Sequence, residues 1–512
     1  MRMKLSKIAL GVAGLCAAPA TFALTPAQMD GATARLWLSG ASAPTASVYK
    51  GVLTLCRGMT YKDALGVTHT NPGTRDAHLY LESSSAGRLP GAAGDRMAYT
   101  CTVGTDDGRA GSLEGKKVAV FHTVEGGSFN YVTPHISIAG EVNPNLPGSL
   151  RRTSNIENLG ATGQCANGTA ENVAVELSGL NNSVGVYRGC ATTVQNFTAN
   201  QSLRANVFQA PDRPEGGFSD TEYLINKLNL DVTTELGEIG SEVPTNIAQV
   251  FGVVVSYPLY YQLQKNDIAD GRLAATCDDA PFTAVSPNLT LACQPDLAAQ
   301  RYTTIANVDT IGGVDGSLFG AAATPPGTSG KVQLHRRAIT SGTQSASNLR
   351  FLEKPCNTGL PQGALNPARA ADSTARVAVT ENSSTGGVKS GLTAATNAGE
   401  FGLGFVSMEN IPVAGVDKWA FVKLDSASPN ADAKQRVTAM DGIYTAWYEL
   451  VAFTAHTAFT EGQDLIAAVN TSLGNPGITD LTGLFITPLA GVEAPNVGKG
   501  FRAGNSCQAP IQ

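Results

Sequence analysis

Short apolar runs alternate with small-residue turns along most of this chain, and the longest runs predict buried strands. Residues 249–256 and 399–407 are almost continuously apolar, a pattern typical of strands covered on both faces of a sheet. Residues 116–121 predict a third buried strand, and residues 35–38 predict a shorter one. Apolar residues at helical spacing follow several of these runs, so the sequence predicts an α/β fold.

The segment 331–352 combines such a strand with a turn and the start of a helix. Residues 331–335 form an extended K-V-Q-L-H run, and two arginines separate it from the turn S-G-T at residues 341–343. Apolar residues at helical spacing follow this turn. Ser341 or Thr343 is therefore a natural N-cap for the predicted helix.

The start of this predicted helix has the chemistry of an anion site. Backbone N–H groups point outward at a helix N-terminus, where the helix dipole also favours negative charge. Arg337 precedes the turn, and a guanidinium can bind an oxyanion or a carboxylate through two hydrogen bonds. The alternative is an ordinary capped helix beside two solvated arginines, Arg336 and Arg337.

Other turns are weaker signals by themselves. Residues 39–45 form a second small-residue turn between a strand and a helix, and a glycine-rich turn at 125–128 follows the strand at 116–121. Asp220, in the run G-F-S-D, either caps the next turn or faces a ligand. The turns at 39–45, 125–128 and 341–343 all follow strands, where ligands bind in open α/β sheets.

The rest of the pattern is assigned more simply. Residues 439–451 are apolar and aromatic and predict a packed helix. Residues 61–76, 160–182 and 357–375 are rich in Gly, Asn, Ala and Thr and predict surface loops. The chain has 512 residues, so we expect more than one core, because single cores stop growing near ~250–300 residues.

Residues 1–23 have the pattern of an export signal. A basic start is followed by a short apolar stretch and a small-residue cleavage site. The apolar stretch is too short for a membrane anchor, and no later segment reaches the length of a membrane helix. We therefore expect a mature protein without a membrane span, located in the periplasm or secreted.

Cysteine usage agrees with export. The chain has nine cysteines, and removal of Cys16 with the signal leaves eight, an even number that indicates disulfides in an exported protein. No C-x-x-C pair is present, so a zinc site is not expected. The simplest of the many pairings is sequential: Cys56–Cys101, Cys165–Cys190, Cys277–Cys293 and Cys356–Cys507.

Charge and motif content exclude several classes of function. Residues 1–23 carry three of the 36 Lys and Arg residues and none of the 42 Asp and Glu residues, so the remainder has a net charge of −9. That charge argues against nucleic acid or anionic lipid as a partner. The six histidines show no H-E-x-x-H spacing, and no G-x-S-x-G or Walker motif is present. We expect no enzymatic activity, no metal and no cofactor, with a phosphohydrolase as the weaker alternative.

The order of the motifs resembles that of the phosphate-binding periplasmic receptors of ABC importers, which are type II periplasmic binding proteins. The resemblance covers residues 35–410, and R-R-A-x-x-S-G-T is its most specific part. The matching runs are S-G-A-S-A (39–43), G-F-S-D (217–220), Q-V-F-G-V-V-V (249–255), R-R-A-I-T-S-G-T (336–343) and A-G-E-F-G-L-G-F-V (398–406).

The resemblance implies a two-lobed α/β fold with disulfide-bearing insertions. Residues 24–247 plus 408–512 would form lobe I, and residues 248–407 would form lobe II. The strands at 249–255 and 401–406 would be the hinge crossings, and closure about them would trap a ligand. In this scheme the Cys356–Cys507 disulfide would link the two lobes and restrict closure unless it lies near the hinge.

The resemblance also implies a ligand site built from both lobes. The arginine before the S-G-T turn would face the anion, and the turn would supply hydroxyls and amides. The aspartate of G-F-S-D would accept a hydrogen bond from a protonated oxyanion, and the first small-residue turn would contribute from the opposite side. The implied ligand-binding residues are Arg337, Ser341, Gly342, Thr343, Asp220, Ala43 and Thr45.

Two departures bear on what is bound. Ile339 stands where the family has an acidic residue that orients the arginine, and Pro44 removes one amide donor from the first turn. The resemblance implies a receptor that binds a small anion, phosphate or a similar oxyanion, without catalysis and delivers it to ABC importer membrane subunits. The alternative is an exported or cell-surface protein that reuses the fold for attachment or for assembly with a secretion or surface partner.

Overall fold

The computed structural model describes most of the chain from residue 32 to residue 511. The export signal expected at residues 1–23 lies outside the described residues and stays a prediction. The stretches not described are 1–31, 83–95, 105–107, 125–126, 137–150, 154–169, 191–193, 197–213, 231, 279–285, 308–314, 321–330, 354, 357–371, 373–375, 480, 489–496 and 512.

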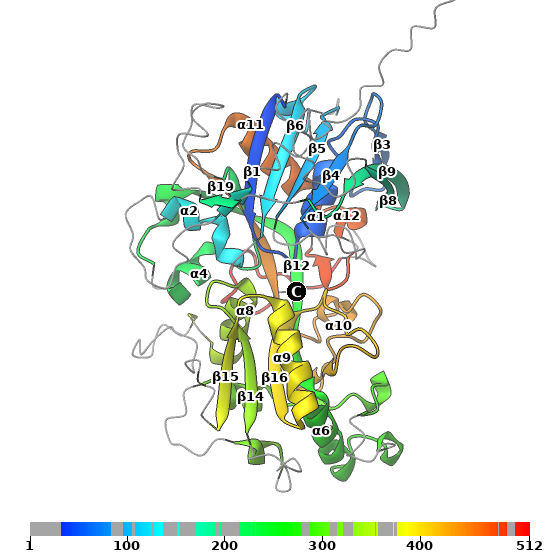
Figure 1. Cartoon of the computed structure of the whole chain (residues 1–512), viewed down its shortest axis with the longest axis vertical. Coiled ribbons are helices and arrows are strands. Elements are labelled where there is room, and N and C mark those ends of the chain that lie inside the picture. Colours follow the sequence, from blue (N-terminus) through cyan, green and yellow to red (C-terminus); the bar gives the residue numbers. More distant parts are fainter. Residues whose placement is uncertain are drawn as a thin grey trace, which may run out of the picture.

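One large mixed sheet organises the molecule (Figure 1). Its strands are β1 (Ala34–Gly40), β4 (His78–Leu81), β5 (Arg96–Thr102), β6 (Lys117–Thr123), β8 (Glu171–Leu177), β9 (Leu180–Tyr187), β11 (Gly216–Ser219), β12 (Gly240–Ser256), β14 (Val332–Arg337), β15 (Val377–Asn382), β16 (Phe401–Ser407), β17 (Trp419–Phe421), β19 (Trp447–Ala455) and β20 (Leu484–Ile486). The main path runs β15-β14-β16-β12-β19-β11-β1-β6-β5-β4-β9-β8, and β17 and β20 pair with β12.

Helices and short strand pairs cover this sheet. The helices are α1 (Thr45–Leu53), α2 (Thr133–Ile136), α4 (Tyr223–Leu230), α5 (Leu236–Ile239), α6 (Tyr257–Ala269), α7 (Ala299–Ala306), α8 (Gly342–Leu352), α9 (Thr385–Ala398), α10 (Val437–Met440), α11 (Thr460–Leu473) and α12 (Pro476–Thr479), and η3 (Ser128–Tyr131) is a 3₁₀ helix. The short pairs are β2 (Thr60–Lys62) with β3 (Thr68–Thr70), β7 (Arg151–Thr153) with β10 (Val194–Asn196), and β13 (Asp296–Leu297) with β18 (Lys423–Leu424).

Strand β12 connects the two ends of the molecule (Figure 1). Its first part pairs antiparallel with β19 and β20, and its last part pairs antiparallel with β16 and β17. Within the first part, the register of the β19 pairing shifts between Pro244 and Ala248, and Asn246 has a φ of 57°. A bulge explains why a proline is tolerated within a strand of 17 residues.

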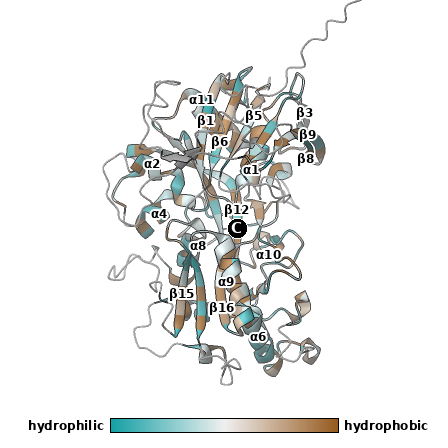
Figure 2. Ribbon diagram, viewed as in Figure 1, coloured by the Kyte–Doolittle hydropathy of each residue, from teal (hydrophilic) through white to brown (hydrophobic). Residues whose placement is uncertain are grey.

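Two large hydrophobic clusters lie on either side of this crossing. One packs α1 and α11 against β1, β4, β5 and β6. The other packs α6, α8 and α9 against β14, β16 and the second part of β12, and it continues through β17 to the start of β19. In Figure 2 the strands at both ends of the molecule contain many hydrophobic residues, whereas α6 contains many hydrophilic ones. The length of the chain predicts more than one core, and the two large clusters agree with that prediction.

The predicted buried strands are confirmed. The run at 249–256 is fully buried within β12, and residues 401–407 of the run at 399–407 form β16, which is buried throughout. The run at 116–121 forms β6, and residues 35–38 lie in β1. Strand β1 is parallel to both β6 and β11, and β14 is parallel to β15 and β16. The chain is therefore a mixed α/β protein, as expected.

Three sequence-based predictions are wrong, and one of them is the surface loop at 61–76, which contains most of the antiparallel β2–β3 pair. Residues 439–451 do not form a packed helix, because residues 447–451 belong to β19, which pairs with both β12 and β11, and only residues 439–440 lie in the short helix α10. An apolar run does not distinguish a buried strand from a buried helix by its periodicity alone. Residues 160–182 are not simply a loop, because they include β8 and the start of the β8–β9 hairpin. Its turn, Ser178-Gly179, has φ values of 54° and 78°, the conformation of a two-residue hairpin turn.

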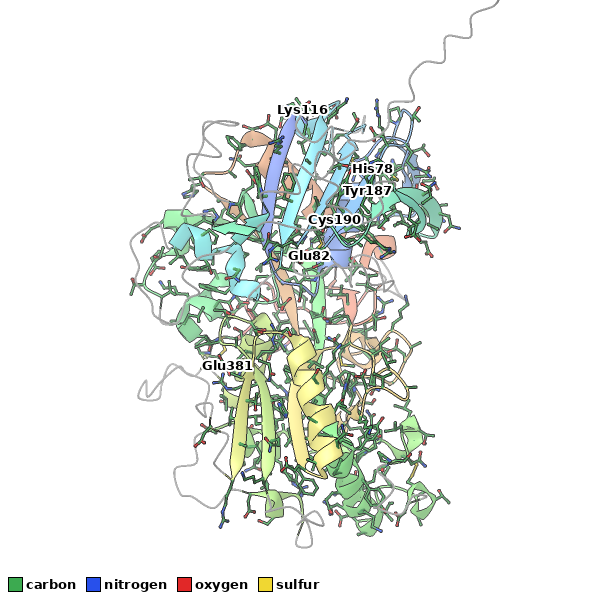
Figure 3. All side chains as sticks on the ribbon, viewed as in Figure 1. His78, Glu82, Lys116, Tyr187, Cys190 and Glu381 are labelled. Atoms are coloured by element: carbon green, nitrogen blue, oxygen red, sulfur yellow. A yellow bond between two sulfur atoms is a disulfide. The ribbon has the colours of Figure 1, made fainter. Side chains whose placement is uncertain are left out.

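Three of the expected disulfides are present. They are Cys56–Cys101, Cys277–Cys293 and Cys356–Cys507. Cys190 is also oxidised and lies near Tyr187 and His78, which belong to the neighbouring strands β9 and β4 (Figure 3). Cys165 falls outside the described residues, so its pairing with Cys190 stays a prediction.

The described residues contain neither a membrane-spanning helix nor a metal-binding cluster. Among them, no helix combines the length and the apolarity that crossing a bilayer requires. No group of three or more His, Cys, Asp or Glu side chains within the same residues is arranged to hold a metal ion.

Candidate functional site

Three segments that are far apart in the sequence meet through Ser128. The Ser128 hydroxyl donates a hydrogen bond to Asp220 Oδ2 at 2.8 Å. The backbone N–H of Gly342 donates to the same hydroxyl oxygen at 3.1 Å. Ser128 is 3 % exposed and Asp220 is 4 % exposed, so these hydrogen bonds lie inside the protein.

Each of these residues follows the carboxyl end of a strand. Asp220 comes directly after β11, Ser128 begins η3 shortly after β6, and Gly342 begins α8 after β14. Strands β11, β1 and β6 are neighbours and run parallel, so their carboxyl ends lie at one edge of the sheet. The position agrees with the general location of ligand sites in open α/β sheets.

Glycines allow the two sides of this junction to approach closely. A Cβ atom at Gly127 would lie 2.8 Å from the carbonyl oxygen of Thr340, and Gly127 also has a φ of 106°. A Cβ atom at Gly342 would lie 2.5 Å from Ser128 Oγ and 2.6 Å from Asp220 Oδ2. The backbone N–H of Phe129 donates to Thr340 O at 3.1 Å. The structure therefore shows a closed junction between the 127–129 and 340–342 backbones.

Asp220 has an uncompensated carboxylate oxygen. Its Oδ1 is buried and has no hydrogen-bond partner among the described residues. Burial raises the pKa of the Asp220 carboxyl to about 6, although the hydrogen bond from Ser128 and the charge of Arg337 act in the opposite direction. The charge of Glu409 raises this pKa further. A hydrogen-bond donor at Oδ1 would therefore stabilise the ionised form of Asp220.

Arg337 lies on the other side of the junction and is held by the residues that connect β15 to α9. Its side chain is 7 % exposed, and it donates from Nη1 to Thr385 Oγ1 at 2.8 Å and from Nη2 to Ser383 O at 3.0 Å. These bonds fix the guanidinium within reach of the field of Asp220. Arg336 instead pairs with Glu381 at 2.8 Å, on the outer strand β15 (Figure 3).

The packing of Ile339 explains why this chain has no acidic residue two positions after Arg337. Its side chain packs against the hydrophobic cluster that contains Phe129 and Tyr223. An acidic residue at this position would be placed against aromatic rings, which is costly for a charge. In this chain Thr385 and the carbonyl of Ser383 orient Arg337 in its place.

The turn at 341–343 is buried and begins α8 as the sequence predicts. Ser341 is the N-cap by position, although its side chain makes no capping hydrogen bond. Ser341 is 2 % exposed and Thr343 is 4 % exposed. The described contacts place the Gly342 amide against Ser128, and whether the hydroxyls of Ser341 and Thr343 reach a ligand stays a prediction.

A polar seam continues along α8 beyond this turn. Ser345 Oγ donates to Asn226 Oδ1 at 3.0 Å, and Asn348 Nδ2 donates to Asn229 Oδ1 at 3.2 Å. Asn226 and Asn229 lie on α4. Ser128 and this seam were both missed as site residues, and the only signal for Ser128 in the sequence was its glycine-rich turn.

The first small-residue turn takes no part in these contacts. The Thr45 hydroxyl and backbone N–H both donate to Ser42 O, at 2.7 Å and 3.2 Å. Within the described residues, no hydrogen bond joins Thr45 or Ala43 to Asp220. Their role in a ligand site therefore stays a prediction, and it requires the 41–45 turn to release these donors.

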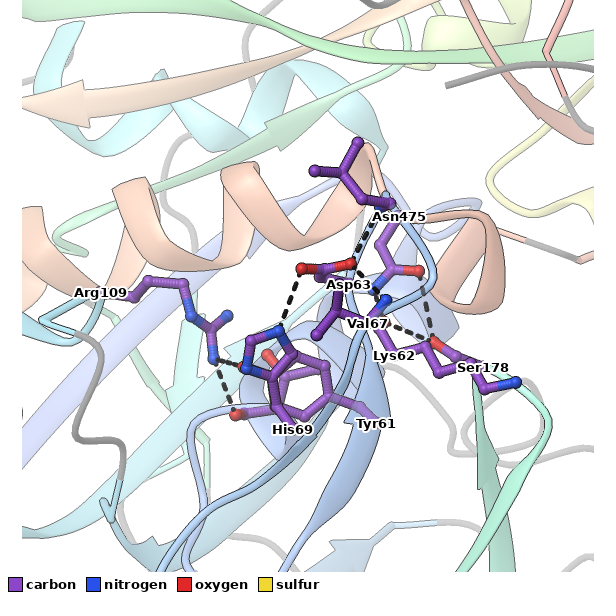
Figure 4. A network of polar contacts seen from close by, with 10 residues as sticks. Tyr61, Lys62, Asp63, Val67, His69, Arg109, Ser178 and Asn475 are labelled. Atoms are coloured by element: carbon purple, nitrogen blue, oxygen red, sulfur yellow. Dashed lines mark hydrogen bonds and ion pairs between the residues drawn. The ribbon is translucent and has the colours of Figure 1, made fainter. Parts of the chain in front are cut away.

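A separate cavity lies elsewhere, near α1 and α12. It measures about 630 Å³ and lies apart from Asp220; its lining includes Lys50, Lys62, Lys434 and Ser178. Figure 4 shows the contacts around it. There Asp63 accepts from the N–H groups of Leu65 and Val67 and contacts His69. The described lining of the cavity has no buried unpartnered carboxylate, and the helix that begins there, α12, has only four residues. The junction therefore remains the candidate site.

Comparison with known proteins adds little to this geometry. No protein-family model matches the chain, and no curated protein matches it. One similar solved structure is described as a possible phosphate binding protein from Planctomyces limnophilus, with 13 % identity and a TM-score of 0.25 over 50 % of this chain and 70 % of that one. Another is a candidate phosphate ABC transporter substrate-binding protein with bound phosphate from Clostridium perfringens, with 13 % identity and a TM-score of 0.25 over 49 % and 79 %. These values are too low to support an argument about this chain.

Proposed function

We propose that this protein is an exported solute-binding protein that holds a small protonated oxyanion, of the hydrogen phosphate type, beside Asp220 without chemical turnover. The buried, unpartnered Oδ1 of Asp220 next to the start of α8 carries the proposal. A protonated oxyanion has an O–H group that can donate to Asp220 and further oxygens that accept from Gly342 N–H and Arg337. A fully ionised oxyanion lacks that donor and would be repelled by the carboxylate.

Ser128 supplies the same hydrogen bonds in the structure. Its hydroxyl donates to Asp220 and accepts from Gly342, which is the pattern expected of one protonated oxygen of the ligand. Binding would therefore require the junction to open and the Ser128 hydroxyl to rotate away. The structure corresponds in this proposal to the closed state of a two-lobed receptor.

The proposed lobes are the two ends of the molecule joined by β12. The 408–446 segment packs in the cluster that contains β16, because Trp419, Phe421 and Tyr444 belong to it. We therefore place the return crossing at β19 rather than at residue 408. Opening would take place about β12 and β19, which pair along both of their parts.

Export is part of the proposal. The disulfides of the described residues form and persist in an oxidising compartment, which agrees with the signal expected at residues 1–23. Importer membrane subunits are the leading partner for a periplasmic receptor of this type. This delivery step belongs to the proposal alone.

A role in attachment or assembly is the second candidate. The tight contact of Gly127 with Thr340 and the Cys356–Cys507 disulfide both favour it, because they oppose the opening that a receptor needs. An assembly protein would keep the junction permanently closed and would bind no small anion.

Isothermal titration calorimetry distinguishes the two candidates. Phosphate, sulfate and small carboxylates would be titrated into the wild-type protein, Arg337→Ala and Arg336→Ala, with folding checked by circular dichroism. Receptor function predicts heat with phosphate and a loss on the order of 2–4 kcal/mol of binding free energy in Arg337→Ala. Arg336→Ala is the matched control, because Arg336 pairs with Glu381. No heat from any anion with the folded wild type would refute the receptor proposal.

A further inference from the structure

The C-terminal segment 497–511 crosses the middle of the molecule beside β12 (Figure 1). Its first residues are tied to both β20 and α10, because Gly498 N–H donates to Ile486 O and Lys499 N–H donates to Met440 O, each at 2.7 Å. Phe501 and Ile511 bond to each other through their backbones. The segment is thus ordered and folded back on itself.

Arg502 anchors this segment to the start of β19. Its guanidinium carbon lies 4.9 Å from the ring centre of Trp447 and 5.0 Å from that of Tyr448. The side chain also donates to Trp447 O at 3.2 Å and to Thr445 O at 3.1 Å. Arg502 is 7 % exposed, so the anchor is buried and well satisfied.

Two buried carboxylates hold the next residues. Glu449 accepts from the backbone N–H of Gly504 at 2.7 Å. Glu222 accepts from the backbone N–H of Ser506 at 2.6 Å and from the Ser506 hydroxyl. Glu222 is two positions after Asp220 and is 8 % exposed. The segment is therefore hydrogen-bonded to Glu222, which is next to the candidate site in the sequence.

The Cys356–Cys507 disulfide then joins this segment to α8. The two Cα atoms are 5.2 Å apart, and the bridge spans 151 positions of sequence. Cys356 comes just after α8, which ends at Leu352. Helix α8 is consequently held at both ends, by the contact of Gly342 with Ser128 at its start and by the disulfide at its end.

We propose that segment 497–511 and the Cys356–Cys507 disulfide form a latch that holds α8 against Asp220 and limits how far the junction opens. The effect of the latch on ligand binding rests on the proposed function, whereas its effect on the opening of the junction does not. Leu352 lies four positions before Cys356, so with the bridge intact the end of α8 stays within roughly 14 Å of Cys356. Without the bridge only noncovalent contacts hold α8, and the junction opens more often.

Two backbone amides report opening directly. Phe129 N–H donates to Thr340 O, and Gly342 N–H donates to Ser128 Oγ, so both lose their partners when the junction separates. Hydrogen–deuterium exchange of peptides covering residues 127–132 and 338–346 measures this opening without any ligand.

The test compares two paired serine variants of the full chain. We expect Cys356→Ser/Cys507→Ser to speed exchange of both peptides by about tenfold or more. Cys277→Ser/Cys293→Ser is the control, because that disulfide joins the residues just after α6 to those before β13, and it should leave both peptides unchanged. Unchanged exchange in the 356/507 variant, or an increase confined to its own cysteine-bearing peptides, would overturn the latch.

A second variant covers the case in which removal of the disulfide prevents folding. Ser506→Ala keeps the bridge and removes the hydroxyl bond to Glu222, so it should speed exchange of the same peptides by a smaller factor. No change in Ser506→Ala would then overturn the latch.

Measurements of phosphate binding test the latch and the proposed function separately. If both are right, the 356/507 variant associates with phosphate several-fold faster than the wild type in stopped-flow fluorescence. Faster amide exchange without phosphate binding in either protein would support the latch and refute the receptor.

Discussion

The hydroxyl of Ser128 bonds to the carboxylate of Asp220 across 92 positions of sequence. The same hydroxyl oxygen accepts a hydrogen bond from the backbone N–H of Gly342, on the other side of the junction. One small side chain therefore provides hydrogen bonds to both Oδ2 of the buried Asp220 and the first backbone N–H of α8. Its removal is a direct measure of what the closed junction contributes.

We expect Ser128→Ala to reduce the free energy of unfolding by about 1–3 kcal/mol, because a buried carboxylate oxygen and a buried N–H lose their partner. The pKa of Asp220 should also rise, because the Ser128 hydrogen bond lowers it. Urea unfolding at pH 7 measures the first effect. Ser47→Ala is the matched control, since Ser47 is equally buried and its hydroxyl has no partner among the described residues; an equal loss in both variants would contradict the prediction.

Two buried acids predict how stability depends on pH. Burial raises the pKa of Asp220 to about 6 and that of Glu242 to about 7, and Tyr131 and the Tyr223 amide donate to Glu242. Because these folded-state values exceed the unfolded values near ~4, the contribution of each group is complete below about pH 4. It is lost as the pH rises through about 6 and 7.

Glu242→Gln isolates this effect. Between pH 5 and pH 8 the wild type should lose about 2–3 kcal/mol more of its unfolding free energy than the variant does. Burial lowers the pKa of His335 to about 4, so this histidine acts in the opposite direction below about pH 6.5, but equally in both proteins. Guanidinium unfolding at several pH values gives the difference. Exposed Glu114→Gln is the control, and parallel pH profiles for wild type and Glu242→Gln would refute the assignment.

Continuous apolar runs and one helix start could be predicted from the sequence. The runs in β12 and β16 are buried on both faces, so no polar position interrupts them. The S-G-T turn begins α8 at Gly342, with Ser341 as its N-cap by position. These features depend on local composition, which the sequence shows directly.

The closure of the junction could not be predicted in this way. The bond between Ser128 and Gly342 joins residues 214 positions apart, and those between α4 and α8 join residues 119 apart. Such pairs depend on how the two ends of the sheet are placed by β12. The β8–β9 hairpin was missed for a local reason, because Ser-Gly is a weaker turn signal than Asn-Gly.

The disulfides should contribute unequally to stability. In the chain-entropy model the Cys356–Cys507 bridge, over 151 positions, stabilises by about 5 kcal/mol, whereas Cys277–Cys293, over 16 positions, stabilises by about 3 kcal/mol. Guanidinium unfolding of the two paired serine variants measures both losses. A greater loss from the shorter bridge would show that native contacts, rather than chain entropy, dominate.

Gly342→Ala tests the close approach at the start of α8. Its new Cβ atom would lie 2.5 Å from Ser128 Oγ and 2.6 Å from Asp220 Oδ2, so one side of the junction must move. We expect a loss of about 1–3 kcal/mol of unfolding free energy, with faster exchange of the 127–132 and 338–346 peptides. Phosphate binding should weaken at least tenfold, because the displaced amide no longer points at the space beside Asp220. Gly237→Ala is the control, since its Cβ atom would meet nothing within 4 Å, and a Gly342→Ala protein that keeps wild-type stability and exchange would show that the junction is not closed in solution.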